Sequence, residues 1–541
     1  FRRVSTCVMF GVFLLMMLIS PTNPVEHTNA SAIGFLMIHD SSVAIAINGT
    51  LAIVAQLERF TGRSRFGSWA TQNFSCHLHH AVLSARQYLR QCGVEVLGFD
   101  AGTYDRVANL QMDPYLGSVG DVRSWLPTHH HQSHAAYGFY SSPFRVALIV
   151  TIDGGGDDGT MHVSIGNATG VHKLTPHGGS KQPNWGFAYH NLALVGQLRG
   201  AYPGHCDRTF ACLNVLAKDL VALATRSTEY NGAMAKAVHA VFNARGVRAV
   251  SSLAYKAKKQ IRWSRGEEAL YEYAATVQSV LQNKVFALVD QYRSMMNEVE
   301  GIVFAGGVAM NMQLNTALSL RYPLPLHVPA GPGDCTVPAG AVLSLSPRPA
   351  PGQSTMYSGF PLHDLRQLPA YVRSCRGTPT SPASVAAMLA AGAVVGLVQG
   401  REELGPFSLG HRSIFAAVHD PAMRALILNL TQENPFQYVP SAVLWERVPE
   451  YFTTAIESPH MSFALKLRQN VSSKCPAVVM ADSSVLVQTV TRSASPWLHA
   501  LLAEVERALG IGMLISAPFR PRGALVSTIH EALHMAVRDR R

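Results

Sequence analysis

A pattern of strand, acidic turn and hairpin occurs twice in the first third of the chain, and it restricts the possible folds more than any other feature. In the first copy an apolar strand ends at Asp40, and the next two strands are joined by Asn48-Gly49. In the second copy an apolar strand ends at Asp153, and the chain turns again at Gly166-Asn167. Asn-Gly between alternating apolar runs is a strong signal of a β-hairpin. The repetition predicts a duplicated α/β unit, although two unrelated hairpins would give the same local pattern.

Strand ends with small residues let a nucleotide phosphate or its metal approach the backbone, and actin-like ATPases place two such ends at one cleft. Another apolar run, residues 301–305, leads into Gly306-Gly307. A helix that opens there would turn its N-terminal amides toward an anion. Asp334 follows a further strand, on a loop. These residues make the N-terminal part a candidate for nucleotide binding.

Composition indicates a globular protein of two or three domains, because 541 residues with 48% hydrophobic and 15% charged content can bury large cores. The net charge of +11 favours anionic partners without choosing among them. Helices are expected over 72–91, 267–296 and 382–391, the last with Ser381 as N-cap and Pro382 at its first position. A buried strand is expected over 393–398. The predicted organisation is an apolar segment (1–30), an N-terminal domain (31–344), a linker (345–358) and a C-terminal α/β domain (359–541).

The apolar segment at the start of the chain follows two basic residues, Arg2 and Arg3, and runs from Val8 to Ile19. It is short for a membrane span, and its flanks are typical of a signal peptide. A signal anchor and an incorrectly assigned start are the alternatives. The protein is therefore expected in the secretory pathway or at a membrane if this segment is used.

Histidines cluster just before the second strand and acidic turn. His130 and His134 lie four residues apart, so on a helix they share a face and can bind one metal ion. A surface pair is the plainer alternative. A second cluster, Cys76-His77-Leu78-His79-His80, continues into a long amphipathic pattern, which favours helix surface and packing over metal binding.

The densest basic stretch, Lys256 to Arg265, contains one tryptophan among five cations. It could contact RNA or a phosphate-rich substrate, but one aromatic is weak support for base stacking. A solvated helix face is the favoured interpretation.

These motifs occur in the order found in the O-carbamoyltransferases of the nodulation and antibiotic-biosynthesis type, and the chain resembles that family from about Gly34 to its C-terminus. The matching segments in the N-terminal part are His39-Asp40-Ser41-Ser42, Glu58-Arg59-Phe60, His130-His131-Gln132-Ser133-His134-Ala135, Ser141-Ser142-Pro143-Phe144, Asp153-Gly154, residues 305–311 and Pro332-Gly333-Asp334. In the C-terminal part the loop from Gln399 to Ile414 and the strand Val487-Gln488-Thr489-Val490 are similar to the family.

The resemblance implies an actin-like N-terminal domain and a C-terminal domain that makes a carbamoyl adenylate from ATP and carbamoyl phosphate. The first domain would then transfer the carbamoyl group to a hydroxyl of a small-molecule acceptor. By resemblance the protein would be cytoplasmic and would not need nucleic acid, and a homodimer is left open. The acceptor itself is not identified.

The resemblance also implies roles for individual residues. A divalent metal, by resemblance iron, would be bound by one group of side chains: His130, His134, Asp153 and Asp334. A second group would bind the nucleotide: Gly306, Gly307, Asn311, Arg412 and Ser413. His39 and Asp40 would orient or deprotonate the acceptor hydroxyl.

The chain departs from the family where the second domain should bind phosphate. Phe407 stands in place of an arginine, Gln432 and Phe436 lie in a stretch that has lost three cations, and Leu486 replaces another arginine. Residues 516–520 differ from the family's Asn-Thr-Ser-Phe-Asn motif. Because arginine forks bind phosphate with paired charge-assisted hydrogen bonds, these losses favour an alternative: a catalytically impaired relative that binds metal or nucleotide. A tRNA-modifying threonylcarbamoyl enzyme is the remaining alternative.

Overall fold

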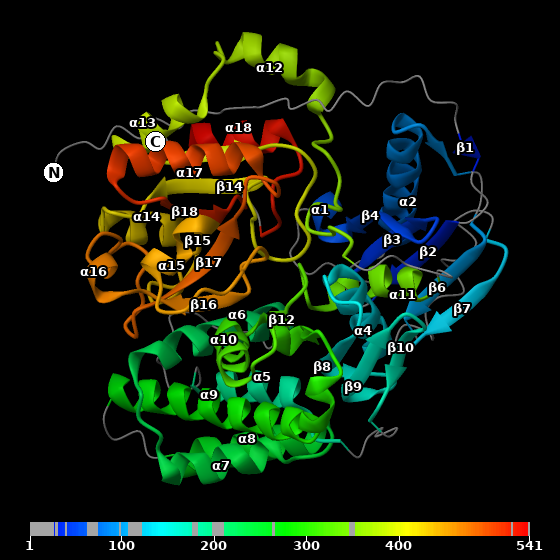
Figure 1. The fold of residues 1–541 in the computed structure, drawn as a ribbon, viewed down its shortest axis with the longest axis vertical. Helices are drawn as coiled ribbons and strands as arrows, with labels where there is room; N and C mark the ends of the chain where they lie inside the picture. Colours follow the sequence, from blue (N-terminus) through cyan, green and yellow to red (C-terminus); the bar gives the residue numbers. More distant parts are fainter. Residues whose placement is uncertain are drawn as a thin grey trace. The chain divides into compact units, whose positions relative to one another are not determined.

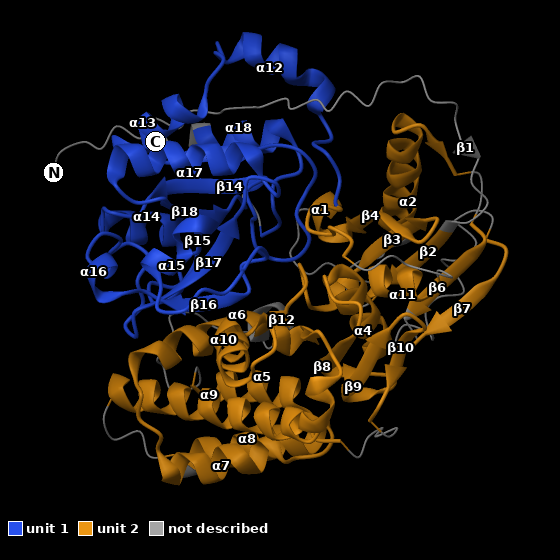
Figure 2. Cartoon of the chain, viewed as in Figure 1, with its two compact units in different colours: residues 1–18, 359–541 blue, residues 19–358 orange. Residues whose placement is uncertain are grey.

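A computed structural model describes residues 26–27, 31–37, 40–61, 74–96, 99–105, 122–175, 182–196, 210–261, 266–345, 352–520 and 523–538. The chain divides into two compact units, one within Ile19–Ser358 and one that includes Gly359–Arg541 (Figure 2). They are called the N-terminal unit and the C-terminal unit. Of the apolar segment predicted over residues 1–30, the structure describes only Glu26–His27, which form the short strand β1. The rest of that prediction lies outside the described residues.

The N-terminal unit contains two five-stranded sheets with the same topology (Figure 1). In each sheet three antiparallel strands are followed by two strands parallel to the first. The first sheet has the order β4 (Thr50–Gln56), β3 (Ser42–Ile47), β2 (Ser31–Leu36), β6 (Ala101–Asp105) and β7 (Trp125–Thr128). The second has the order β10 (Gly170–Lys173), β9 (Gly159–Asn167), β8 (Ala147–Gly156), β11 (Gly301–Ala305) and β12 (Leu326–His327).

The equal strand order confirms the duplicated α/β unit predicted from the two hairpins, and two such sheets agree with the actin-like fold class that the resemblance implies. The central strands are buried, as expected for apolar runs without alternation: each residue of β11 is buried. The first hairpin turns at Asn48 and Gly49, both of which have positive φ, 49° and 77°. The turn predicted at Gly166-Asn167 lies at the end of β9, which pairs antiparallel with β10. The strand predicted to end at Asp153 continues to Gly156, and its pairing with β9 is irregular between Ile152 and Gly156.

Helices of the N-terminal unit pack on these sheets and on one another. Two of them, α4 and α11, approach unusually closely, because a Cβ atom added at Gly340 of α11 would lie 1.8 Å from the carbonyl oxygen of Ser133 in α4. The helices are α1 (Leu57–Thr61), α2 (Phe74–Gln91), α4 (His130–Ser141), α5 (Trp185–Gly196), α6 (Phe210–Leu223), α7 (Gly232–Phe242), α8 (Val247–Gln260), α9 (Glu267–Asp290), α10 (Met312–Arg321) and α11 (Val337–Leu345).

The predicted helices are present with small differences at their ends. The helix predicted over 72–91 is α2, and the one predicted over 267–296 is α9, which stops at Asp290 and is followed by the 3-10 turn Arg293–Asn297. The glycine pair opens a 3-10 turn, Gly307–Met310, rather than an α-helix. The α-helix α10 begins only after Asn311, whose side chain accepts a hydrogen bond from the N–H of Leu314 at 3.0 Å.

The C-terminal unit is built on one six-stranded, mostly antiparallel sheet in which only β15 and β17 pair in parallel. Its order is β13 (Val395–Val398), β14 (Arg412–Ala417), β18 (Met513–Pro518), β15 (Ser441–Leu444), β17 (Ser484–Val490) and β16 (Phe463–Lys466). The helices are α12 (Leu368–Ser374), α13 (Pro382–Ala390), α14 (Ala422–Leu430), α15 (Val448–Tyr451), α16 (Gln469–Ser472), α17 (Pro496–Leu509) and α18 (Ile529–Arg538).

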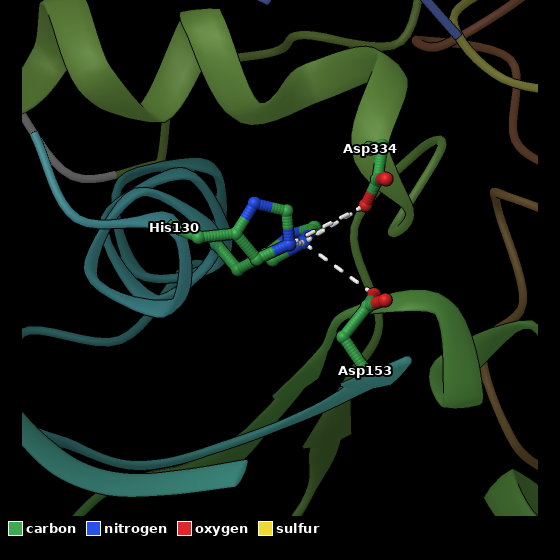
Figure 3. Close-up of side chains that lie close together, drawn as sticks. His130, Asp153 and Asp334 are labelled. Atoms are coloured by element: carbon green, nitrogen blue, oxygen red, sulfur yellow. Dashed lines mark hydrogen bonds and ion pairs between the residues drawn. The ribbon is translucent and has the colours of Figure 1, made fainter. Parts of the chain in front are cut away.

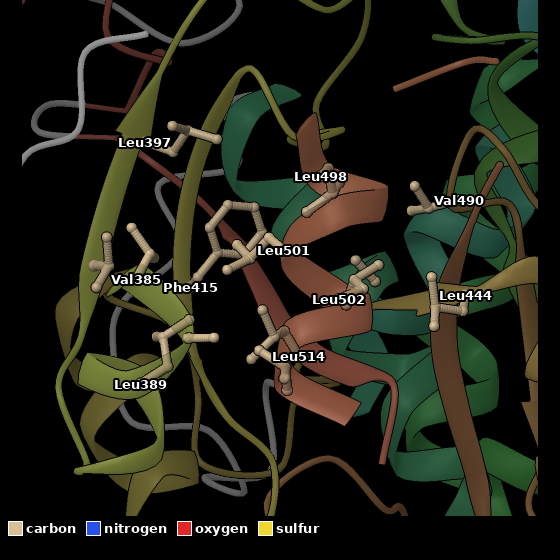
Figure 4. Packing of buried hydrophobic residues seen from close by; sticks show 14 residues of the cluster. Val385, Leu389, Leu397, Phe415, Leu444, Val490, Leu498, Leu501, Leu502 and Leu514 are labelled. Carbon is tan, nitrogen blue, oxygen red and sulfur yellow. The ribbon is translucent and has the colours of Figure 1, made fainter. Parts of the chain in front are cut away.

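One apolar core of the C-terminal unit lies between this sheet and the helices α13 and α17. Leu389 of α13, Phe415 of β14 and Leu501 of α17 are fully buried in one apolar cluster (Figure 4). The predicted N-cap of α13 is confirmed, because Ser381 Oγ accepts the N–H of Ser384 at 3.2 Å and Pro382 is the first helical residue.

Candidate metal centre

Two histidines and two aspartates from three separate segments of the N-terminal unit point toward one another (Figure 3). His130 and His134 lie one turn apart on α4, Asp153 lies in β8, and Asp334 begins the 3-10 turn (Asp334–Thr336) that precedes α11. The two Nε2 atoms are 3.1 Å apart. Asp334 Oδ1 lies 3.5 Å from His130 Nε2 and 3.4 Å from His134 Nε2, and Asp153 Oδ2 lies 3.5 Å from His134 Nε2.

These four side chains fit a divalent cation. They are all buried, so two carboxylates without a cation would carry a large desolvation cost. Ligand atoms that each bind one ion at about 2.1 Å lie roughly 3.0 to 3.4 Å from one another, close to the distances found here. Two imidazole nitrogens with two carboxylate oxygens suit iron, zinc or manganese better than magnesium or calcium.

The backbone places these ligands through close packing that only glycine permits. The short approach at Gly340 brings the start of α11, and with it Asp334, against α4. Tyr137 of α4 reinforces the arrangement, because its hydroxyl donates to the carbonyl oxygen of Ala330 at 2.8 Å, four residues before Asp334.

Asp153 is held by backbone amides on both sides. Its Oδ1 accepts the N–H of Gly154 at 2.5 Å, and its Oδ2 accepts the N–H of Gly307. Gly306 has a φ of 89°, and a Cβ there would lie 2.4 Å from the carbonyl oxygen of Ile152. The two glycines therefore hold the strand that carries Asp153 in place, in addition to the nucleotide binding predicted for them.

Of the three predicted nucleotide residues of the N-terminal unit, Gly306 and Gly307 lie beside the strand of Asp153, and Asn311 is the N-cap of α10. Gly306 donates its N–H to the carbonyl oxygen of Pro332 at 2.8 Å, and Gly307 donates to Asp153. Asn311 exchanges two hydrogen bonds with Gln278 of α9, at 2.9 and 3.1 Å. Gln278 was not predicted, because no local pattern indicates which helix faces the cap of another. Nucleotide binding by these residues stays a prediction.

Asp40 lies in the turn between β2 and β3 with a φ of 57°, a left-handed conformation that costs free energy for a residue with a side chain. The segment that follows it reaches the loop of Asp334, since Ser42 Oγ donates to the carbonyl oxygen of Cys335 at 2.8 Å. Burial raises the pKa of the Cys335 thiol, and the nearby carboxylate of Asp40 adds to the rise. Asp40 is thus close to the segment that carries a candidate metal ligand. His39, predicted to act with it, lies outside the described residues.

The predicted nucleotide residues of the C-terminal unit are buried and bonded within the protein. Arg412 donates from Nε to the carbonyl oxygen of Val526 at 3.1 Å and from its terminal nitrogens to carbonyl oxygens of residues 399, 400 and 411. Ser413 Oγ accepts the N–H of Gly410 at 3.0 Å. Binding of a nucleotide by these two residues stays a prediction and would require some of these bonds to be exchanged.

The loop between residues 400 and 413 closes around a buried carboxylate. Glu403 Oε1 accepts three backbone N–H groups, those of Leu409, His411 and Arg412, at 2.9, 2.7 and 2.9 Å. Phe407 lies in this loop and is half-buried. Leu486, which stands where the family has an arginine, is buried in β17.

Two other sequence clusters do not join the metal group. Cys76 and the adjacent histidines lie on α2, and within the described residues the groups that could hold an ion contain none of them. On α8, Lys256 and Lys259 are exposed, with the ammonium group of Lys259 4.9 Å from the centre of the Tyr255 ring. Residues 262–265 of the basic stretch lie outside the described residues. None of the described helices has the length and hydropathy of a membrane span.

Sequence reasoning missed a second polar group at the start of α4. His129, Asp157 and Asp158 lie close enough that one ligand atom of each falls within 4.8 Å of the others. The two aspartates follow Asp153 in a glycine-rich turn, but nothing in the pattern indicated which element they would contact.

Comparison with known proteins identifies both units. Residues 118–343 match the family model described as carbamoyltransferase N-terminus, and residues 386–540 match the model described as carbamoyltransferase C-terminus. Nodulation protein U of Rhizobium fredii is 33% identical over 41% of this chain and 39% of its own length. The 3'-hydroxymethylcephem-O-carbamoyltransferase of Streptomyces clavuligerus is 33% identical over 31% of this chain and 32% of its own length. Full-length HypF in the phosphate- and nucleotide-bound form is similar at 12% identity with a TM-score of 0.35, over 60% of this chain and 56% of the HypF chain.

Proposed function

Because the chain belongs to the carbamoyltransferase family, we propose that it is an O-carbamoyltransferase that makes a carbamoyl adenylate from ATP and carbamoyl phosphate and transfers the carbamoyl group to a hydroxyl of a small acceptor. The observation that carries the proposal is the convergence of His130, His134, Asp153 and Asp334 in the actin-like unit. The name of the Streptomyces clavuligerus relative gives the same class of reaction, transfer of a carbamoyl group to oxygen.

In the transfer step the acceptor oxygen attacks the carbamoyl carbon, the bond between that carbon and the adenylate oxygen breaks, and AMP leaves. A divalent cation, by resemblance iron, would be held by the four side chains and would offset the negative charge that develops on the leaving AMP. The buried imidazoles and carboxylates keep the centre away from bulk water, which strengthens electrostatic interactions there.

Asp40 is the candidate for the residue that orients and deprotonates the acceptor hydroxyl. A carboxylate can orient a hydroxyl and accept its proton as the new bond forms. Its position in a turn whose next residues contact the Asp334 loop supports this role. His39 precedes it in sequence and is proposed to share the task.

Pyrophosphate release is the direct test of the first step. Purified protein, supplied with ferrous iron, ATP and carbamoyl phosphate, is expected to form a carbamoyl adenylate, with release of pyrophosphate from ATP and, on consumption of one water, of inorganic phosphate from carbamoyl phosphate. Omitting carbamoyl phosphate controls for ATP hydrolysis. Absence of pyrophosphate release with the metal bound would contradict adenylate formation by this chain.

A specific observation favours a second candidate, a family member that binds metal and nucleotide but makes the adenylate poorly. Phe407, Gln432 and Leu486 stand where the family carries cations, and Leu486 is buried in a strand. An uncharged side chain cannot form the paired hydrogen bonds with which arginine holds phosphate. This candidate predicts cation and nucleotide binding without pyrophosphate release.

A further inference from the structure

The turn between β8 and β9 lies directly against the first residue of α4. A Cβ added at Gly156 would lie 2.6 Å from His130 Cβ, so only glycine allows this approach. The next two residues, Asp157 and Asp158, continue the turn toward the start of the helix. The turn between β8 and β9 thus contacts His130, one of the four candidate metal ligands.

The two aspartates cap α4 from outside the helix. The N-cap residue, His129, makes no side-chain capping bond of its own. Asp157 Oδ1 accepts the N–H of His130 at 3.0 Å, and Asp158 Oδ1 accepts the N–H of His131 at 3.1 Å. Carboxylates at this end of a helix also interact favourably with its dipole.

His129 completes the arrangement, since its Nδ1 lies 2.7 Å from Asp157 Oδ2. His129, Asp157 and Asp158 could be taken for a second cation site. However, each carboxylate already receives a helix N–H, so capping accounts for the cluster without an ion.

The contacts connect two parts of the candidate metal centre. Strand β8 carries Asp153 and leads into the turn that holds His130, while Thr151 of the same strand contacts His131 Nδ1 through its hydroxyl at 3.0 Å. The distance between His130 and Asp153 is therefore set by two contacts with the start of α4, one from Thr151 before Asp153 and one from Asp157 after it. Metal sites lose affinity when ligands are displaced by a fraction of an ångström.

We propose that Asp157 is a positioning residue that holds His130 in place for the cation, an inference that rests on the cation centre of the proposed function. Its carboxylate bonds to the backbone N–H of His130 and is not one of the four groups proposed to bind the cation. It would influence cation binding by fixing the backbone of His130 and the first turn of α4.

The test is a titration of the full chain with Co²⁺, whose visible absorption reports the geometry of its ligands. Asp157→Ala removes the acceptor of the His130 N–H, and we expect the Co²⁺ affinity to fall about 10- to 100-fold, the effect typical of partners that orient metal ligands. Asp157→Asn keeps an oxygen acceptor and should retain most of the affinity with the wild-type spectrum.

Asn231→Ala is the matched control for loss of a helix cap. Asn231 caps α7 in the same unit by accepting the N–H groups of Ala233 and Met234, both at 3.1 Å. This variant should lower the melting temperature as Asp157→Ala does but leave Co²⁺ binding unchanged.

The outcomes separate the two proposals. Wild-type affinity in Asp157→Ala, or an equal loss of affinity in Asn231→Ala, would overturn the positioning role while leaving the cation centre intact. A wild-type protein that binds no Co²⁺, Fe²⁺ or Zn²⁺ would overturn the cation centre and the positioning role together.

Discussion

The Nε2 atoms of His130 and His134 lie 3.1 Å apart in the interior of the N-terminal unit, and both lie about as close to one carboxylate oxygen of Asp334. Without an ion, a proton must lie between the two nitrogens, because two lone pairs that face each other repel. A cation removes that requirement, since each nitrogen then donates its lone pair to the ion. The two imidazoles and the Asp334 carboxylate are therefore suited to bind one cation together.

Asp334→Asn should abolish most of the divalent-cation affinity. The loss should exceed the roughly 10- to 100-fold typical of a residue that only orients a ligand, because a charged oxygen is removed from the centre itself. Isothermal titration with Fe²⁺ under anaerobic conditions measures it. Asp290→Asn, which removes a surface carboxylate paired with Arg321 at 2.7 Å, is the control and should bind as the wild type does. Unchanged binding by Asp334→Asn would rule out Asp334 as a ligand.

Gly340→Ala should destabilise the N-terminal unit by about 3 kcal/mol or more, because the new methyl group would overlap the carbonyl oxygen of Ser133 and force α4 and α11 apart. Urea denaturation measures the change. Gly232→Ala, in the first turn of α7, meets no atom within 4 Å and should leave stability equal or slightly higher. Equal stability of the two variants would contradict the close helix contact.

Acidification should destabilise the C-terminal unit through His411. Burial lowers the pKa of this imidazole, whose Nδ1–H donates to the carbonyl oxygen of Arg401 at 2.7 Å. In the unfolded chain the His411 imidazole takes up a proton near the ordinary histidine pKa of about 6.5, whereas in the folded chain it takes up a proton only at lower pH. Stability should fall as the pH drops below that value, by up to about 1.4 kcal/mol per pH unit, and should be independent of this group above it.

The measurement for His411 is urea denaturation of the wild type and His411→Gln between pH 5 and 8, a range of about three units around the ordinary histidine pKa. The variant should show the smaller slope below pH 6.5 or so, and both proteins should have the same slope above it. Identical slopes throughout would show that His411 does not contribute.

Restoring cations to the C-terminal unit should raise pyrophosphate release. The combined variant Phe407→Arg, Gln432→Arg and Phe436→Arg returns guanidinium groups that can bind phosphate with paired hydrogen bonds. Phe407→Leu is the control, because it removes the ring without adding charge. An unchanged rate in the combined variant, with the protein folded, would show that lost phosphate capture is not what limits adenylate formation.

Much of the fold was accessible from local patterns. Asn48-Gly49 and Gly166-Asn167 predicted the hairpin turns, and their repetition predicted the duplicated unit that the equal strand order confirms. Ser381 and Pro382 gave the start of α13, because capping depends on neighbouring residues. The helix after Gly306-Gly307 was predicted too early, since the cap that starts α10 is the side chain of Asn311.

The candidate site was less accessible. Spacing along one helix brought His130 and His134 together, but Asp334 was assigned only by resemblance, and the structure alone brings it beside them. The capping of α4 by Asp157 and Asp158, and the pairing of Asn311 with Gln278, depend on which elements pack together. Such contacts leave no periodic signal in the sequence.

The four candidate ligands come from parts of the chain that are synthesised at different times. His130, His134 and Asp153 leave the ribosome well before Asp334, which lies beyond the helices α5 to α10. A cation bound by all four would close a long loop, and the loop can close only after that intervening helical segment has been made. Release of the ion during unfolding would then accompany the separation of α4 from the loop of Asp334, so the rate of cation loss would report on the kinetic lifetime of this part of the folded unit.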